Sequence, residues 1–196
     1  MSLRKFRLDD EHAVYDICLR TGRAGADATD LYEDPRLIGH VYAGPYLRFA
    51  PQFATVVDEG QVLGYVLAAP DTREFEARCE EEWWPALRKK YPNPPELLTP
   101  DQRLMRVIHS PHRTPEGLVG DYPSHLHIDL LPAAQGRGHG RTLINRLEDE
   151  LRDAGSPGVH LGFDPANTAA APFYTKLGFH EAARDEWVVW MAKSLV

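Results

Sequence analysis

Residues 129–140 read DLLPAAQGRGHG and are the most informative part of this chain. An alternating, strand-like segment leads into this glycine-rich turn, and an amphipathic helical pattern follows it. Such a turn exposes several backbone N–H groups at a helix N-terminus, where the helix dipole also favours negative charge. Gly136, Gly138 and Gly140 allow the backbone to approach a bulky anion closely. The turn therefore predicts a pyrophosphate-binding site.

Two common phosphate-binding motifs do not fit this turn. A P-loop has a lysine and then serine or threonine after its last glycine, whereas Arg141 and Thr142 follow Gly140 here. The dinucleotide-binding fingerprint needs a third glycine at a spacing that this turn lacks, and it usually follows the first strand of a domain. An ordinary tight turn is the other alternative. Three alternating glycines argue against it, because a simple turn does not need their entropic cost.

Composition narrows the class of protein. The chain has 196 residues, enough for one large domain and short for two. The net charge of −7 argues against a nucleic-acid-binding surface and suits a cationic or amine substrate. Cys18 and Cys79 form no CxxC pair, which indicates buried, reduced thiols in a cytoplasmic protein. We find no signal peptide and no apolar segment of transmembrane length, so we expect no membrane partner.

The hydrophobic pattern predicts a mixed α/β protein with a central sheet, and we interpret residues 1–196 as a single domain. Residues 23–47 read as irregular, and the proline-dense segment 92–123 reads as a loop excursion that covers the substrate side. The predicted strands are 3–8, 53–57, 62–68, 125–130, 159–163 and 186–192. The predicted helices are one after Asp10, 72–91, one after the glycine turn, and 168–177.

Two motifs resemble those of the GNAT family of N-acetyltransferases. The spacing of five residues resembles the family's acyl-CoA signature: Leu130, Pro132, Gln135, Gly138 and Gly140. Residues 167–179, NTAAAPFYTKLGF, resemble its second motif. The N-terminal half, with YAGPY at 42–46, FAPQF at 49–53 and WWP at 83–85, is similar to the acetyltransferase-like C-terminal domain of O-GlcNAcase and its free-standing bacterial relatives. The animal domains look degraded in the glycine turn, whereas this chain keeps it.

The resemblance implies a fold, a cosubstrate and a reaction. The fold would be a GNAT-like mixed central β-sheet flanked by helices on both faces, and the cosubstrate acetyl-CoA. The reaction would be acetyl transfer by direct attack to an amine of a protein, peptide or small molecule. A homodimer is one open oligomeric state. The residues expected to bind acetyl-CoA are Leu130, Leu131, Pro132, Gln135, Gly136, Arg137, Gly138, His139, Gly140, Arg141, Asn167 and Phe173.

Acetyl transfer to an amine needs a base and an acid. A lysine amine has a pKa of about 10.4 and must lose a proton before it attacks. Asp129, at the end of the strand before the glycine turn, is the expected base; a helix cap or a partner of a nearby histidine is the alternative. Tyr174 is the expected acid for the leaving thiolate, with a core aromatic as the alternative. We expect a backbone N–H near Leu131 to stabilise the oxyanion.

Rival interpretations come from other classes of protein. His125, His127 and Asp129 form the start of a metallohydrolase motif, with His109 and His112 nearby in sequence. Alternate strand residues spread over about 13 Å, so a regular strand cannot bring all three to one metal, and we expect no metal site. A catalytically weak acyl-CoA-binding module is the other alternative. One or two of five aromatic residues are expected in the acceptor groove, namely Tyr42, Tyr46, Trp83, Trp84 and Tyr91.

Overall fold

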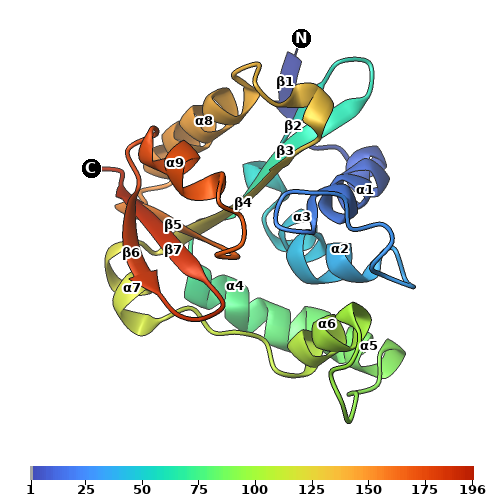
Figure 1. Cartoon of the computed structure of the whole chain (residues 1–196). Helices are drawn as coiled ribbons and strands as arrows, with labels where there is room; N and C mark the ends of the chain where they lie inside the picture. The colour runs from blue at the N-terminus through green and yellow to red at the C-terminus, as the bar shows by residue number, and fades with distance from the viewer. Residues whose placement is uncertain (1) are drawn as a thin grey trace.

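The computed structural model describes residues 2–196, so Met1, the start of the predicted domain, lies outside the described residues. Within the described chain, seven strands form one sheet in the order β1-β2-β3-β4-β5-β7-β6 (Figure 1). Only β4 and β5 pair in parallel; the other neighbours are antiparallel. The strands are β1 (Ser2–Lys5), β2 (Thr55–Asp58), β3 (Val62–Ala69), β4 (Ser124–Leu130), β5 (Gly158–Phe163), β6 (His180–Arg184) and β7 (Val189–Ser194).

Helices cover both faces of this mixed sheet, as predicted (Figure 1). Tyr65 and Leu67 of β3 belong to a first core shared with the helices from α1 to α6, whereas Val66 and Ala68 belong to a second core shared with α8 and α9. The helices are α1 (Glu11–Thr21), α2 (Leu37–Tyr42), α3 (Gly44–Phe49), α4 (Thr72–Arg78), α5 (Trp84–Lys90), α6 (Pro100–His109), α7 (Glu116–Asp121), α8 (His139–Asp153) and α9 (Ala170–Thr175). The short η segments are η1 (Leu8–Asp10), η2 (Pro51–Phe53), the π-helical η3 (Cys79–Trp83) and η4 (Pro132–Ala134).

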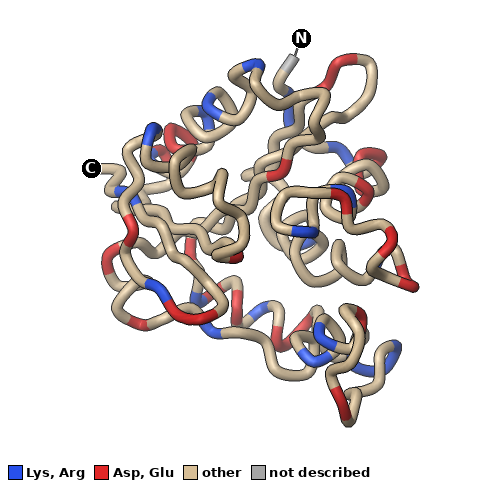
Figure 2. The backbone as a smooth tube through the Cα atoms, in the orientation of Figure 1, with Lys and Arg blue, Asp and Glu red and all other residues tan. Residues whose placement is uncertain are grey.

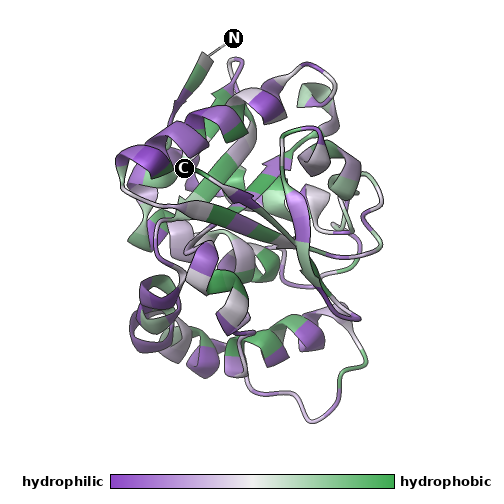
Figure 3. Ribbon diagram, turned by 90° about the vertical axis from the view of Figure 1, so that its left-hand side faces the viewer, coloured by the Kyte–Doolittle hydropathy of each residue, from purple (hydrophilic) through white to green (hydrophobic). Residues whose placement is uncertain are grey.

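The helix after the glycine turn, α8, follows its sequence pattern. Leu143, Ile144, Leu147 and Leu151 are at most 1% exposed and form one stripe on the second core. Burying each of these side chains contributes on the order of 1.5–3 kcal/mol. Figure 3 shows the same division across the molecule, with hydrophobic residues concentrated along the central strands and hydrophilic residues on the outer turns of helices. Gly155, with φ of +82°, follows the end of the helix in the left-handed conformation that is typical of this position.

Glycine and proline misled the sequence prediction in the N-terminal half. Residues 23–47 were expected to be irregular, but they contain α2 and most of α3. A Cβ at Gly39 would collide with the ring of Tyr15, and a Cβ at Gly44 with Trp83, so these glycines permit close helix packing rather than break helices. A glycine that permits close packing inside a helix cannot be distinguished, from the sequence alone, from a glycine that ends a helix.

The proline-dense segment 92–123 is also partly helical, because it contains α6 and α7. Pro100 occupies the first turn of α6, where proline is tolerated, and Thr99 and Gln102 form a capping box there. At the C-terminal end one strand was predicted, 186–192. The structure has a hairpin of two strands instead, in which β6 ends before residue 186 and β7 starts at Val189.

The parallel pairing of β4 with β5 is short, and as a result the two strands separate within the sheet. The two strands are in register only at Ser124 with Val159 and at His125 with His160. Beyond these pairs β4 continues beside β3 as far as Leu130, opposite Gly64, while β5 continues beside β7. The sheet therefore opens between the C-terminal halves of β4 and β5.

Charged residues of both signs are interspersed along the chain (Figure 2). Among the helices of residues 2–196, none has both the length and the apolar composition that crossing a membrane requires.

Candidate active site

A cavity of about 510 Å³ lies where β4 and β5 separate. Asp129 from β4, Tyr174 from α9 and Asn167 from the preceding loop all line it. Asp129 shares a face with Tyr65, on the side of the first core, whereas Tyr174 belongs to the second core. The cavity thus brings side chains from both faces of the sheet together through the gap. These three residues were all predicted site residues.

Asp129 is held by two neighbours. Its Oδ2 atom accepts a hydrogen bond of 2.6 Å from the Tyr65 hydroxyl and lies 3.0 Å from Nε2 of His127. Burial and the Asp129 charge raise the pKa of Tyr65 well above its usual value, so the phenol remains a donor. The alternative role predicted for Asp129, partner of a nearby histidine, is present. The Oδ1 atom has no hydrogen-bond partner among residues 2–196 and remains available as an acceptor.

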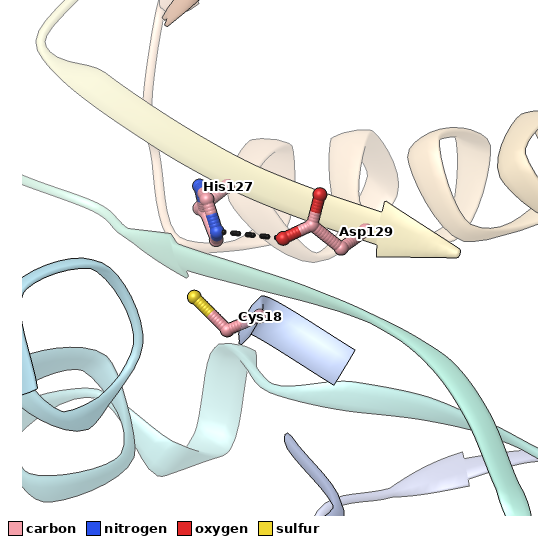
Figure 4. A group of neighbouring side chains, drawn as sticks. All are labelled: Cys18, His127 and Asp129. Atoms are coloured by element: carbon pink, nitrogen blue, oxygen red, sulfur yellow. Dashed lines mark ion pairs between the residues drawn. The ribbon is translucent and has the colours of Figure 1, made fainter. Parts of the chain in front are cut away.

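A third side chain joins this pair, as Figure 4 shows. Cys18 of α1 is 2% exposed, and its Sγ, a nitrogen of His127 and an oxygen of Asp129 all lie within 4.8 Å of one another. Burial alone lowers the pKa of His127, but the Asp129 carboxylate, with a smaller contribution from Cys18, outweighs this effect and raises that pKa to about 10. Burial raises the pKa of the Cys18 thiol. At neutral pH these shifts favour an imidazolium at His127 and a thiol at Cys18.

Tyr174 combines a packed ring with a place on the cavity wall. It is 8% exposed, and its ring contacts Phe163, Phe173 and Phe179 at centroid distances of 6.0, 5.1 and 5.7 Å. Burial raises the pKa of the phenol, and the charge of Asp129 adds to this rise. The hydroxyl therefore keeps its proton. The two interpretations of this residue, core aromatic and proton donor, are compatible in this geometry.

The glycine turn has the backbone that its sequence predicts. Gly136 and Gly138 have φ of +70° and +83°, and α8 begins immediately afterwards at His139. No atom of residues 2–196 lies within 4 Å of a Cβ built on Gly138, so within the described chain this position faces open space. Gly140 differs, because a Cβ there would come within 3.0 Å of Phe173. The first two glycines serve the turn, and the third lets the helix pack closely.

The polar side chains of the turn are held by the protein. Gln135 donates through Nε2 to the Leu130 carbonyl at 2.8 Å. Arg137 forms two hydrogen bonds with Glu59 of the β2–β3 turn, at 2.7 and 2.9 Å. The whole of His139, ring and backbone, is 1% exposed, and its Nε2 lies 3.4 Å from Glu59. The residues of the turn that were expected to bind acetyl-CoA, 135–141, do not line the cavity.

The oxyanion donor predicted near Leu131 is not the N–H of Leu131 itself. The N–H of Leu131 donates to the Leu63 carbonyl at 2.9 Å and is therefore occupied. Neighbouring peptide groups of a strand point to opposite sides in the sheet plane. The N–H groups of Ile128 and Leu130 consequently point away from β3, toward the gap left by β5.

Only one of the five aromatic residues considered for the acceptor groove, Tyr42, lines the cavity; its ring stacks 6.3 Å from that of His127. The other four, Tyr46, Trp83, Trp84 and Tyr91, pack in or against the first core. Sequence analysis missed two further aromatic residues, Trp187 and Trp190, which line the cavity from β7 and the turn before it. Residues 112–114 of the proline-dense segment also contribute to the wall.

Of the histidines in the metallohydrolase alternative, His125 and His109 lie apart from His127 and Asp129. His125 is 2.8 Å from the Thr72 hydroxyl and packs beside Phe75, so it is separate from His127 and Asp129. His109 is 2.8 Å from the Tyr91 carbonyl.

Comparison with known proteins supports the interpretation of the two motifs. The sequence model described as the acetyltransferase (GNAT) family matches residues 111–179. The protein SsHAT, known from its crystal structure, is 42% identical to this chain, with a TM-score of 0.93 over 100% of this chain and 98% of SsHAT. The chain therefore belongs to the GNAT family of acetyltransferases, whose cosubstrate is acetyl-CoA, as the motifs predicted.

Two other relatives show the range of this similarity. Protein O-GlcNAcase of Rattus norvegicus is 27% identical over 189 residues, which are 94% of this chain and 20% of that protein. The chain thus spans about a fifth of that relative's length. The structure of yncA from Salmonella typhimurium, solved with its cofactor acetyl-CoA, shares the fold at 18% identity and a TM-score of 0.59, over 100% of this chain and 94% of yncA.

Proposed function

We propose that this chain transfers the acetyl group of acetyl-CoA to an amine of a protein, peptide or small molecule by direct attack. The observation that carries the proposal is the opening between β4 and β5. It gives a thioester access to one cavity in which Asp129 and Tyr174 both lie, a carboxylate from one face of the sheet and a protonated phenol from the other.

In this proposal the turn before α8 binds the pyrophosphate. Its backbone N–H groups and the N-terminal end of a 15-residue helix favour an anion. Arg137 and Arg141 add positive charge, although Arg137 must share its guanidinium with Glu59. Asn167, on the cavity wall, is suited to hydrogen-bond the pantetheine arm.

The chemistry needs three proton or charge adjustments. Asp129 accepts the proton of the attacking amine, directly or through water, and the adjacent imidazolium of His127 balances the charge of the carboxylate before the attack. The N–H of Leu130, on the side of the gap, stabilises the oxyanion that forms. Tyr174 donates its proton to the departing thiolate of CoA.

The acceptor side is both aromatic and acidic. Tyr42 and Trp187 are 41% and 71% exposed and line the cavity, as does Asp164. Aromatic faces and carboxylates attract a cationic amine before it loses its proton. A cytoplasmic location and a homodimer remain predictions from the sequence.

Turnover with a panel of amines tests this proposal. Purified protein, acetyl-CoA and lysine peptides, N-terminal peptides or small polyamines are combined, and CoA release and acetylated product are both measured. We expect product with at least one class and none without protein. Binding of acetyl-CoA by calorimetry without turnover on any class would favour the acyl-CoA-binding module instead.

A further inference from the structure

The group formed by Cys18, His127 and Asp129 has a second chemical capacity. We propose that these three side chains form a binding site for a thiophilic divalent cation of the Zn²⁺ type, and that the bound ion inhibits acetyl transfer. The three come from α1 and β4, converge at the cavity wall, and all line the cavity (Figure 4).

The donor set matches the proposed ion. Zinc binds cysteine sulfur, histidine nitrogen and carboxylate oxygen, usually with tetrahedral geometry. Bond lengths of about 2.0–2.3 Å place tetrahedral ligand atoms about 3.3–3.6 Å apart. Here Nε2 of His127 lies 3.0 Å from Oδ2 of Asp129, and one donor atom from each of the three side chains lies within 4.8 Å of the other two. Small side-chain movements would therefore create the site. Hard ions such as Mg²⁺ prefer oxygen ligands and are disfavoured by the thiol and imidazole.

The surroundings also suit a metal site with three protein ligands. The side chains of His127 and Asp129 are 28% and 21% exposed, so an ion can enter from the cavity, and its fourth position would face that cavity. Tyr65 already donates to Asp129 and would orient the carboxylate, as groups behind metal ligands commonly do. On binding, the Cys18 thiol and the imidazolium each release a proton to solvent, and the thiolate and carboxylate neutralise the ion.

The inhibition, though not the binding, rests on the proposed function. An ion held by Asp129 occupies the carboxylate that would take the amine proton, and its bound water fills part of the cavity. This site differs from the metallohydrolase motif considered from the sequence, because His125 is replaced by Cys18, a residue far away in the chain.

Cobalt spectroscopy tests the site without reference to activity. EDTA-treated, reduced protein is titrated with Co²⁺, and a thiolate-to-cobalt charge-transfer band is followed in the near ultraviolet. We expect the band, at one ion per chain, in the wild type and in Cys79→Ser, which removes the other buried cysteine. Cys18→Ser should abolish it, and Asp129→Asn should weaken Co²⁺ binding by more than about tenfold. Circular dichroism establishes that each variant is folded.

Two outcomes would overturn the site: no band in the wild type, or a band that persists in Cys18→Ser. A Cys18→Ala variant provides a second test if the serine variant does not fold.

The activity experiment separates this inference from the proposed function. Added Zn²⁺ should slow acetyl transfer by the wild type and by Cys79→Ser, and Cys18→Ser should require at least about tenfold more Zn²⁺ for the same inhibition. A charge-transfer band without inhibition would overturn the inhibitory role alone. If metal-free protein shows no acetyl transfer, the proposed function fails, while the spectrum still decides the metal site.

Discussion

At the scale of single residues, the side-chain direction on β4 decides which groups meet. Alternation along the strand correctly placed His125, His127 and Asp129 on one face, and the strand's end brought Asp129 to the cavity. The contact with Cys18 could not be predicted, because its helical spacing fits a plain core residue and only tertiary packing brings α1 to β4. Local periodicity predicts on which face of a strand or helix a residue lies, but it does not predict which distant residue it contacts.

Tyr174→Phe separates ring packing from proton transfer. Phenylalanine keeps the contacts with Phe163 and Phe179 but lacks the hydroxyl. We expect acetyl-CoA affinity and thermal stability close to the wild type, and a transfer rate lower by about ten- to a thousand-fold, the usual scale for a lost general acid. Calorimetry, thermal unfolding and steady-state kinetics measure these. An unchanged rate with lower stability would show that Tyr174 is only a core residue.

Asp129→Asn tests the base through its pH dependence. Asparagine retains an oxygen that accepts from Tyr65 but cannot take a proton. The transfer rate should fall at neutral pH, and the loss should shrink at high pH, where solvent deprotonates the amine acceptor. Acetyl-CoA affinity should change little. We would compare pH–rate profiles of both proteins with and without chelator; a pH-independent loss together with lower stability would contradict the role of base.

At the scale of elements, regular segments with strong periodicity were predicted well. The hairpin β2–β3, strand β4, helix α8 and strand β5 agree with the sequence pattern, because each buries a face with its own period. The helices α2, α3, α6 and α7 were missed; in the first three, Gly39 and Gly44 serve close packing and Pro100 starts a helix. The separation of β4 from β5, which makes the cavity, depends on pairing between strands and leaves no local pattern.

Gly138→Glu tests the turn before α8 as the pyrophosphate site. We expect wild-type protein to bind acetyl-CoA in the micromolar range or tighter, about −8 kcal/mol. The glutamate should abolish this binding, because it adds a like charge where the turn is open and disfavours the φ of +83°. Gly138→Asn is the matched control: asparagine tolerates positive φ and adds no charge, so its loss should be smaller. Calorimetry showing unchanged affinity in the glutamate variant would refute the assignment.

At the scale of the whole molecule, buried histidines make the free energy of unfolding depend on pH. Burial lowers the pKa of His125 to about 3 and that of His40 to about 4, and it also lowers that of His160. Their unfolded pKa is about 6.5, so below that pH the unfolded chain binds more protons and acid favours unfolding. His127 acts oppositely, because its pKa is raised to about 10: its contribution is complete below pH about 6.5 and is lost as pH rises toward 10.

The free energy of unfolding should therefore be largest near neutral pH and should fall between pH 7 and 5. Urea unfolding at several pH values measures the slope, and His125→Gln should flatten it by at most about 1.4 kcal/mol per pH unit, the value for one proton. His12→Gln is the control, because His12 is exposed on α1. If His125→Gln leaves the slope unchanged, the histidine between β4 and α4 is already accessible to protons in the folded protein. The opening between β4 and β5 would then admit solvent along the whole strand, beyond the cavity that holds Asp129.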